Sequence, residues 1–71
     1  MPKAGIIIKR IDGENPILGN SKVRFFIEYP DGKVKRLTKD GSFSEINVGD
    51  TVITSWSLLD GWTVEKVARV R

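Results

Sequence analysis

The sequence predicts a small all-β domain, a barrel of five or six strands of the SH3-like or OB-like kind. The first observation is a series of turn signals, because an Asp-Gly pair or another Gly dipeptide recurs about every ten residues. The second is that the pieces between these turns are rich in β-branched and aromatic residues, which favour strands. Short strands with regularly spaced turns are typical of small β-barrels.

The first predicted strand runs from Gly5 to Ile11. Ile6, Ile7 and Ile8 follow one another, which predicts a strand that is buried on both faces or that crosses the centre of the barrel. A loop is expected over residues 12–20.

The second predicted strand, Lys22–Tyr29, has the clearest alternation. Its hydrophobic residues at every second position share one face: Val23, Phe25, Ile27 and Tyr29. The following Pro-Asp-Gly sequence matches a type I turn with a glycine bulge, which closes a hairpin. The return strand is expected over Lys33–Thr38.

The second half of the chain contains one ambiguous segment and two predicted strands. Residues 43–48 suit a short strand or a single helical turn, and both remain open. Residues Thr51–Trp56 predict a strand, and a loop follows at 57–61. Trp62–Val70 predict the last strand, with either a bulge or hydrophobic residues on both faces. Because no helix-length segment separates the strands, the SH3-like form is slightly favoured.

The hydrophobic positions on the expected inner faces predict the core. They are Ile6, Ile8, Val23, Phe25, Ile27, Val34, Ile46, Val48, Val52, Val64 and Val67.

Length and composition predict a single domain over residues 1–71 without catalytic activity. The chain has no cysteine and no histidine, so it lacks disulfides, thiolate metal sites and the commonest general base. Its aspartates lie mostly at turns, where turn chemistry explains them without a metal. We therefore expect no enzyme activity, no cofactor and no metal.

The apolar segments are too short for a membrane helix, which needs roughly 18 apolar residues. The longest apolar run is Ile6–Ile8, and the first residues lack the core of a signal peptide. We expect a soluble, cytoplasmic protein.

The chain carries a formal net charge of +3, which favours anionic partners. One segment holds four positive charges and no negative one: Lys33, Lys35, Arg36 and Lys39. Further basic residues lie on strands that can pair nearby: Lys9, Arg10, Lys22 and Arg24. Such a face would contact phosphates in a salt-dependent manner with little sequence preference. The alternative is a solvated hairpin edge, where lysines discourage aggregation between strands.

Three aromatic residues are candidates for base stacking. Phe26 lies between Arg24 and Glu28 on an otherwise polar face, where it would stack on a base or cover apolar surface under a loop. Trp56 and Trp62 flank one loop and would form either a cross-strand pair, which we favour, or a ligand cradle.

The order of turns also carries a resemblance. Phe-Ile-Glu-Tyr precedes Asp31-Gly32-Lys33-Val34, then Gly49-Asp50 begins a strand, and Asp60-Gly61 precedes the last one. Residues 25–67 thus resemble the C-terminal tail of the large subunit of bacterial exodeoxyribonuclease VII. This resemblance implies an assembly module or a nucleic-acid-associated module, and it carries over no catalytic residue.

The function that these features predict is non-catalytic binding of nucleic acid, either DNA or RNA. The basic segment and its flanking cations would contact phosphates, while Phe26 and one of the tryptophans would stack on bases. The alternative is a protein-interaction or assembly module, in which the tryptophan-flanked loop or a free strand edge meets a partner or a second copy.

Overall fold

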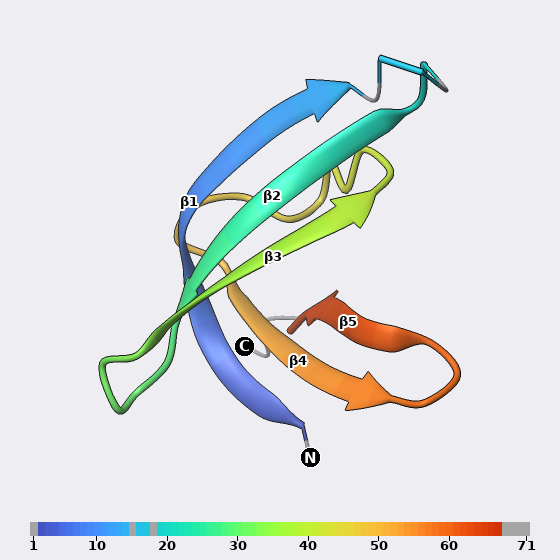
Figure 1. Ribbon diagram of the computed structural model, residues 1–71. Coiled ribbons are helices and arrows are strands. Elements are labelled where there is room, and N and C mark those ends of the chain that lie inside the picture. The colour runs from blue at the N-terminus through green and yellow to red at the C-terminus, as the bar shows by residue number, and fades with distance from the viewer. Residues whose placement is uncertain (1, 15, 18, 68–71) are drawn as a thin grey trace.

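The structure is a computed structural model that describes residues 2–14, 16–17 and 19–67. These residues form one antiparallel sheet of five strands in the order β3-β2-β1-β4-β5 (Figure 1). The strands are β1 (Lys3–Glu14), β2 (Ser21–Glu28), β3 (Val34–Asp40), β4 (Thr51–Ser57) and β5 (Gly61–Lys66). The all-β prediction is confirmed. Within the described ranges no backbone pairing joins β3 to β5, so the sheet is open between these two edge strands.

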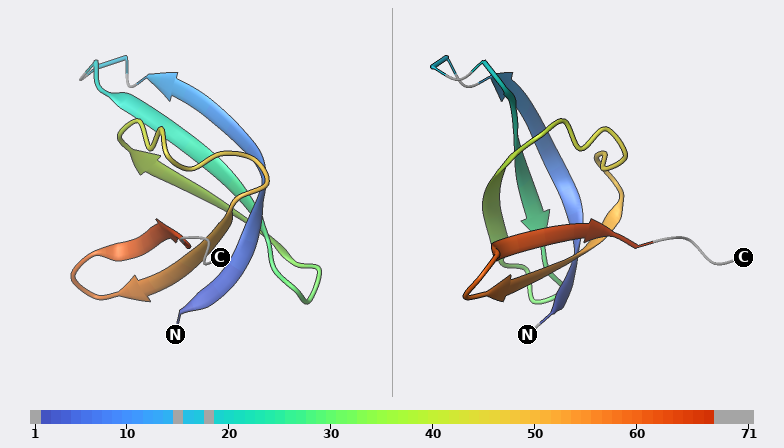
Figure 2. Two further views of the ribbon diagram at one scale, coloured as in Figure 1. Left: turned by 180° about the vertical axis from the view of Figure 1, so that it is seen from behind. Right: turned by 90° about the vertical axis from the view of Figure 1, so that its right-hand side faces the viewer.

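The long strand β1 is shared by the two halves of the sheet. Its first residues, Lys3–Ile6, pair with β4, and Ile6–Glu14 pair with β2. The register shifts between Ile7 and Lys9, which marks a β-bulge at Ile8. The sheet is strongly bent, and the β4–β5 hairpin crosses the concave side of the β1–β2–β3 layer (Figure 2).

A glycine permits close packing within this bend. Gly5 is buried, and a Cβ atom there would lie 2.6 Å from Cγ2 of Ile27 and 3.0 Å from the carbonyl oxygen of Glu28. Since real Cβ atoms do not approach other atoms so closely, any larger residue would push β1 and β2 apart.

The core fills the concave side of the sheet. Its buried hydrophobic residues are Ile7, Val23, Phe25, Ile27, Tyr29, Leu37, Ile46, Val52 and Val64. Six of the predicted core residues are among them: Val23, Phe25, Ile27, Ile46, Val52 and Val64. The predicted alternation along β2 is therefore confirmed.

The predicted burial of Ile6 and Ile8 is wrong. Their exposed fractions are 49% and 44%, whereas Ile7 between them is 1% exposed. Strand alternation turns only Ile7 toward the core, and the bulge at Ile8 then shifts the inward face by one residue.

Three valines predicted in the core are exposed instead. Val34 faces outward because its strand buries Leu37, which lies on the opposite face. Val48 lies in a turn, and Val67 follows the end of β5.

The β2–β3 hairpin has the predicted turn. The main-chain N–H of Gly32 donates to the carbonyl oxygen of Tyr29 at 2.9 Å, and the N–H of Tyr29 donates to that of Lys33 at 2.9 Å. Gly32 has φ of 86°, the left-handed conformation of a glycine bulge.

The β3–β4 connection, residues 41–50, contains turns rather than a strand or a helix. One turn is closed by the N–H of Ile46 donating to the carbonyl oxygen of Phe43 at 3.0 Å. Ile46 is 1% exposed and enters the core, and the Phe43 ring meets that of Phe25 edge-on with centroids 5.9 Å apart. Through Ile46 and Phe43, the β3–β4 connection thus packs on the core.

The last strand is shorter than predicted, since it ends at Lys66, and the predicted residues 68–70 lie outside the described part of the chain. No helix long and apolar enough to cross a membrane occurs among the described residues.

Candidate nucleic-acid interface

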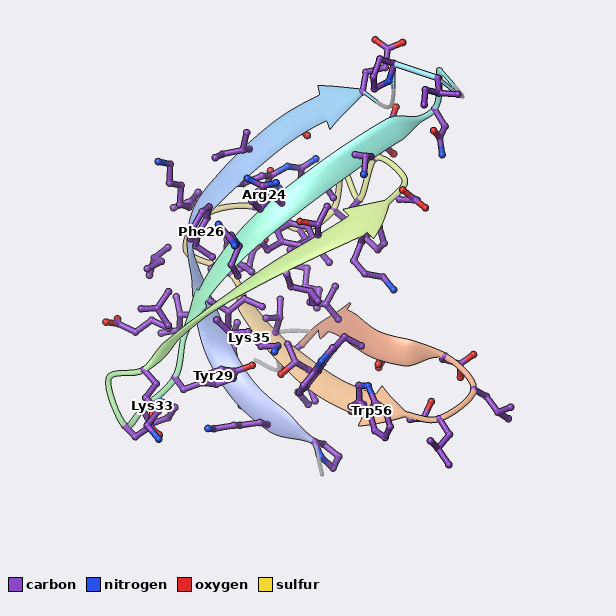
Figure 3. All side chains as sticks on the ribbon, in the orientation of Figure 1. Arg24, Phe26, Tyr29, Lys33, Lys35 and Trp56 are labelled. Atoms are coloured by element: carbon purple, nitrogen blue, oxygen red, sulfur yellow. The ribbon has the colours of Figure 1, made fainter. Side chains whose placement is uncertain are left out.

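The structure divides the predicted site residues between two faces. The outer cluster lies on the convex side of the β1–β2–β3 layer and consists of Lys9, Lys22, Arg24, Phe26 and Arg36. The seam cluster lies where β3 faces β5 and consists of Lys35, Lys39, Trp56 and Trp62. Lys33 belongs to neither, because it lies at the β2–β3 turn. Figure 3 shows Phe26 and Arg24 on the side away from the β4–β5 hairpin, and Lys35 on the side toward it.

Strand register places Phe26 between two cations in the outer cluster. Its direct neighbours are Lys9 on β1 and Arg36 on β3. Lys9 Nζ lies 5.6 Å from the centroid of the Phe26 ring, within the range of a cation–π contact. Phe26 is half-buried, so the ring keeps part of its surface open to solvent.

The next row of the same face continues the positive surface. Arg24 lies between Ile11 on β1 and Thr38 on β3, and its Nε donates to Thr38 Oγ1 at 3.2 Å. Ile11 is 42% exposed, which adds apolar area beside the guanidinium.

Carboxylates border these two rows but do not enter them. Glu28 lies opposite Val34 at one end of the face, and Asp40 lies opposite Lys22 at the other. Among the described residues, no ion pair joins a carboxylate to a cation of the outer cluster. These cations are therefore available to an anionic ligand.

The β2–β3 turn adds a charged but internally paired group. The N–H of Lys33 donates to Asp31 Oδ1 at 3.0 Å, and this hydrogen bond lowers the pKa of Asp31 below its usual value, assisted by the positive charges of Lys3 and Lys33. Lys3 Nζ lies 3.7 Å from Asp31 Oδ2. The side chain of Lys33 is exposed at the tip.

In the seam cluster, two lysines of β3 converge on one tryptophan of β5. Lys35 Nζ lies 3.8 Å from the centroid of the Trp62 ring, and Lys39 Nζ donates to the carbonyl oxygen of Trp62 at 2.8 Å. Both lysines are half-buried because, with Leu37 between them, they share the inward face of β3. They therefore connect the two edge strands through side chains.

Trp56 and Trp62 are direct cross-strand partners on β4 and β5. This register places the two residues opposite each other, as the predicted cross-strand pair requires. Their exposed fractions are 51% and 37%, so both rings also remain accessible.

Arg10 is not part of a basic surface, contrary to its place among the predicted cations. Its guanidinium donates to the carbonyl oxygens of Phe43, at 2.6 Å, and of Ile46 and Ser42, and it also pairs with Asp12 at 2.8 Å. The bulge in β1 turns this side chain inward, where it is only 13% exposed. Arg10 thus anchors the β3–β4 connection.

The described residues border hollows near the outer face. One, of about 540 Å³, is bordered by residues of β1 and the β2–β3 turn, including Ala4, Tyr29 and Pro30. Another, of about 210 Å³, is lined by Arg24 and Lys22 of the outer cluster and by Glu14. Across the described part of the chain, no three His, Cys, Asp or Glu residues gather as a metal site would require.

Comparisons with known proteins found no relative of this chain. No family model matches the chain, no curated protein matches it, and no solved structure matches the fold.

Proposed function

We propose that this chain is a non-catalytic module that binds single-stranded nucleic acid, DNA or RNA, on the outer cluster. The observation that carries this proposal is the register of one row, in which the half-exposed ring of Phe26 lies between Lys9 and Arg36. An accessible ring flanked by cations offers a base a stacking surface and offers the adjoining phosphates two positive charges.

The strand order supports an OB-like form of the fold. In the order β3-β2-β1-β4-β5, strands β3 and β5 are the two edges, and the side chains of Lys35 and Lys39 on β3 reach Trp62 on β5. We propose that the bent sheet is a partly open barrel whose remaining seam is the β3–β5 gap. OB-folds are five-stranded, partly open barrels that bind oligonucleotides on the face of their second and third strands. The outer cluster lies on the corresponding strands, and the resemblance of residues 25–67 to the exodeoxyribonuclease VII tail implies a nucleic-acid-associated module or an assembly module.

The expected affinity depends on salt. If Lys9, Arg24 and Arg36 each neutralise one phosphate, the logarithm of the association constant falls with the logarithm of salt concentration with a slope of about −2. Stacking on Phe26 contributes roughly 1–3 kcal/mol and little sequence preference.

The test is fluorescence anisotropy of labelled oligo-dT and oligo-U of ten nucleotides, each titrated with the protein at two salt concentrations. We expect Phe26→Ala to weaken binding at both salts, because stacking does not depend on screening. Arg36→Glu should weaken it by about ten-fold or more at low salt and flatten the salt dependence.

The matched control is Lys33→Glu, which makes the same change in charge at the hairpin tip. We expect it to weaken binding less than Arg36→Glu does, because Lys33 lies beyond the border formed by Glu28. Wild-type protein that binds neither oligonucleotide at low salt would refute the proposed function.

A second candidate, a protein-interaction or assembly module, is favoured by the tip of the β4–β5 hairpin. Leu58 and Leu59 are 89% and 96% exposed there. Adjacent leucines projecting from a loop are suited to insertion into an apolar pocket of another chain. Light scattering of the wild type and of a Leu58→Ser/Leu59→Ser variant tests self-association, and a monomer at every concentration would count against it.

A further inference from the structure

We infer that a single strand bound at the outer cluster crosses the free edge of β3 and continues into the seam cluster. There, Lys35 and Lys39 bind a phosphate and the exposed Trp56 ring stacks on a base. This inference rests on the proposed function and extends its site to the opposite side of β3.

The first support is the position of β3 at the edge of the sheet. In the described ranges its only strand partner is β2. Lys35 and Arg36 are consecutive residues, so their side chains lie on opposite faces of this strand. A bound strand therefore passes from one positive face to the other by crossing the width of a single strand.

The second support is the charge of the seam. The ammonium groups of Lys35 and Lys39 both contact Trp62, one on its ring and the other on its carbonyl oxygen. No carboxylate of the described residues forms an ion pair with either lysine. Two positive charges that converge without a counter-charge favour an anion, and the adjacent anionic ligand would be the phosphate backbone.

The third support is the aromatic surface beside these lysines. Trp56 is the direct cross-strand partner of Trp62 and is 51% exposed. The ring of Trp62 is covered in part by Lys35, whereas among the described residues no cation–π contact involves Trp56. Trp56 is therefore the more accessible of the two rings and the one that we assign to a base.

The seam cluster contains both tryptophans of the chain, so tryptophan emission reports on it directly. The experiment compares a trinucleotide, which spans the outer cluster alone, with a decanucleotide. Binding is measured by anisotropy of the labelled oligonucleotide and, in parallel, by tryptophan emission. We expect the decanucleotide to quench the emission and the trinucleotide to leave it almost unchanged.

Two variants test the residues separately. Lys35→Met/Lys39→Met should weaken decanucleotide binding by about ten-fold while leaving trinucleotide binding unchanged, with Lys33→Met as the control that removes one charge at the turn. Trp56→Leu, which retains the Trp62 ring and carbonyl oxygen that Lys35 and Lys39 contact, should weaken decanucleotide binding and reduce the quenching. Circular dichroism of each variant verifies that the sheet remains folded.

The outcomes separate the two proposals. Decanucleotide binding that is seen by anisotropy, with neither quenching nor any effect of these variants, would overturn the seam path and leave the outer site standing. Absence of any binding by the wild type would overturn the proposed function, and this inference with it.

Discussion

The hydroxyl groups of Tyr29 and Thr54 lie 2.6 Å apart in the buried interior. Tyr29 follows the end of β2, whereas Thr54 is in the middle of β4, so this hydrogen bond connects the two halves of the bent sheet. Thr54 Oγ1 also lies 3.3 Å from the carbonyl oxygen of Lys3, to which it donates. Two hydrogen bonds of the Thr54 hydroxyl thus connect β4 with β1 and with the residue that follows β2.

Tyr29→Phe should lower the free energy of unfolding by about 1 kcal/mol, because it removes one neutral hydrogen bond without leaving a cavity. Thr54→Val should lower the free energy of unfolding by more, about 1–3 kcal/mol, because it leaves the buried Tyr29 hydroxyl without a hydrogen-bond partner. In urea unfolding, the double variant should be destabilised by less than the sum of the two single variants. Strict additivity would show that the two hydroxyls do not interact.

Arg10→Met should lower the free energy of unfolding by about 2–4 kcal/mol, because several carbonyl oxygens of the β3–β4 connection lose a charged donor. Arg24→Met is the matched control, and we expect a change within about 0.5 kcal/mol because its side chain is exposed. Chemical denaturation measures both. Equal effects of the two variants would contradict the anchoring role of Arg10.

Gly5→Ala should destabilise the fold by about 2 kcal/mol, because the new methyl group meets Ile27 and the main chain of β2. Gly13 on the same strand provides the control. A Cβ atom there has no neighbour within 4 Å, so Gly13→Ala should be nearly neutral. Thermal unfolding of both variants tests the close approach at Gly5, and an unchanged midpoint for Gly5→Ala would exclude it.

The β2–β3 turn should weaken in acid through Asp31. The Lys33 N–H hydrogen bond lowers the pKa of this carboxyl in the folded protein, so its ionised form contributes stability above the unfolded pKa. This contribution is lost as the pH falls below the usual value of 3.8 and through the folded pKa. An NMR titration of the side-chain carboxyl should give a midpoint below 3.8. A midpoint at or above that value would contradict the assigned hydrogen bond.

The β2–β3 hairpin could be predicted from sequence because its determinants are local. The turn needs positive φ at Gly32, and the alternation of Val23, Phe25 and Ile27 determines which face is buried. The buried face of β3 could not be predicted in this way, because Val34 and Leu37 lie on opposite faces and either could have pointed inward. Only packing against the other strands selects Leu37.

For a related reason, the sequence did not predict which residues of β1 face the core or that Arg10 binds the β3–β4 connection. Three successive isoleucines give no alternation between the two faces of a strand. No residue type identifies a β-bulge in a sequence, so the change of register at Ile8 could not be predicted. Arg10 looks like any surface cation in the sequence. Its carbonyl partners are 32 to 36 residues away in the chain, and only the folded β3–β4 connection brings them to it.

For the candidate site, the residue types and the opposite faces of Lys35 and Arg36 could be predicted from the sequence, but the partners that each face gains from other strands could not. Lys35 and Arg36 are neighbours in one basic segment, and strand alternation sends them to opposite faces. The pairing of β1 with β2 then determines that Lys9 joins Arg36 rather than Lys35. Such placement depends on register between strands, which composition does not encode.

The sharing of β1 between two partners also bears on how the chain folds during synthesis. Lys3 pairs with Thr54, so β1 is synthesised well before the β4 residues that pair with its Lys3–Ile6 segment. Contacts between such distant residues are slow to form because a long loop must close first. A nascent chain therefore carries an unsatisfied β1 edge, which would pair with neighbouring nascent chains unless translation is rapid or a chaperone covers it.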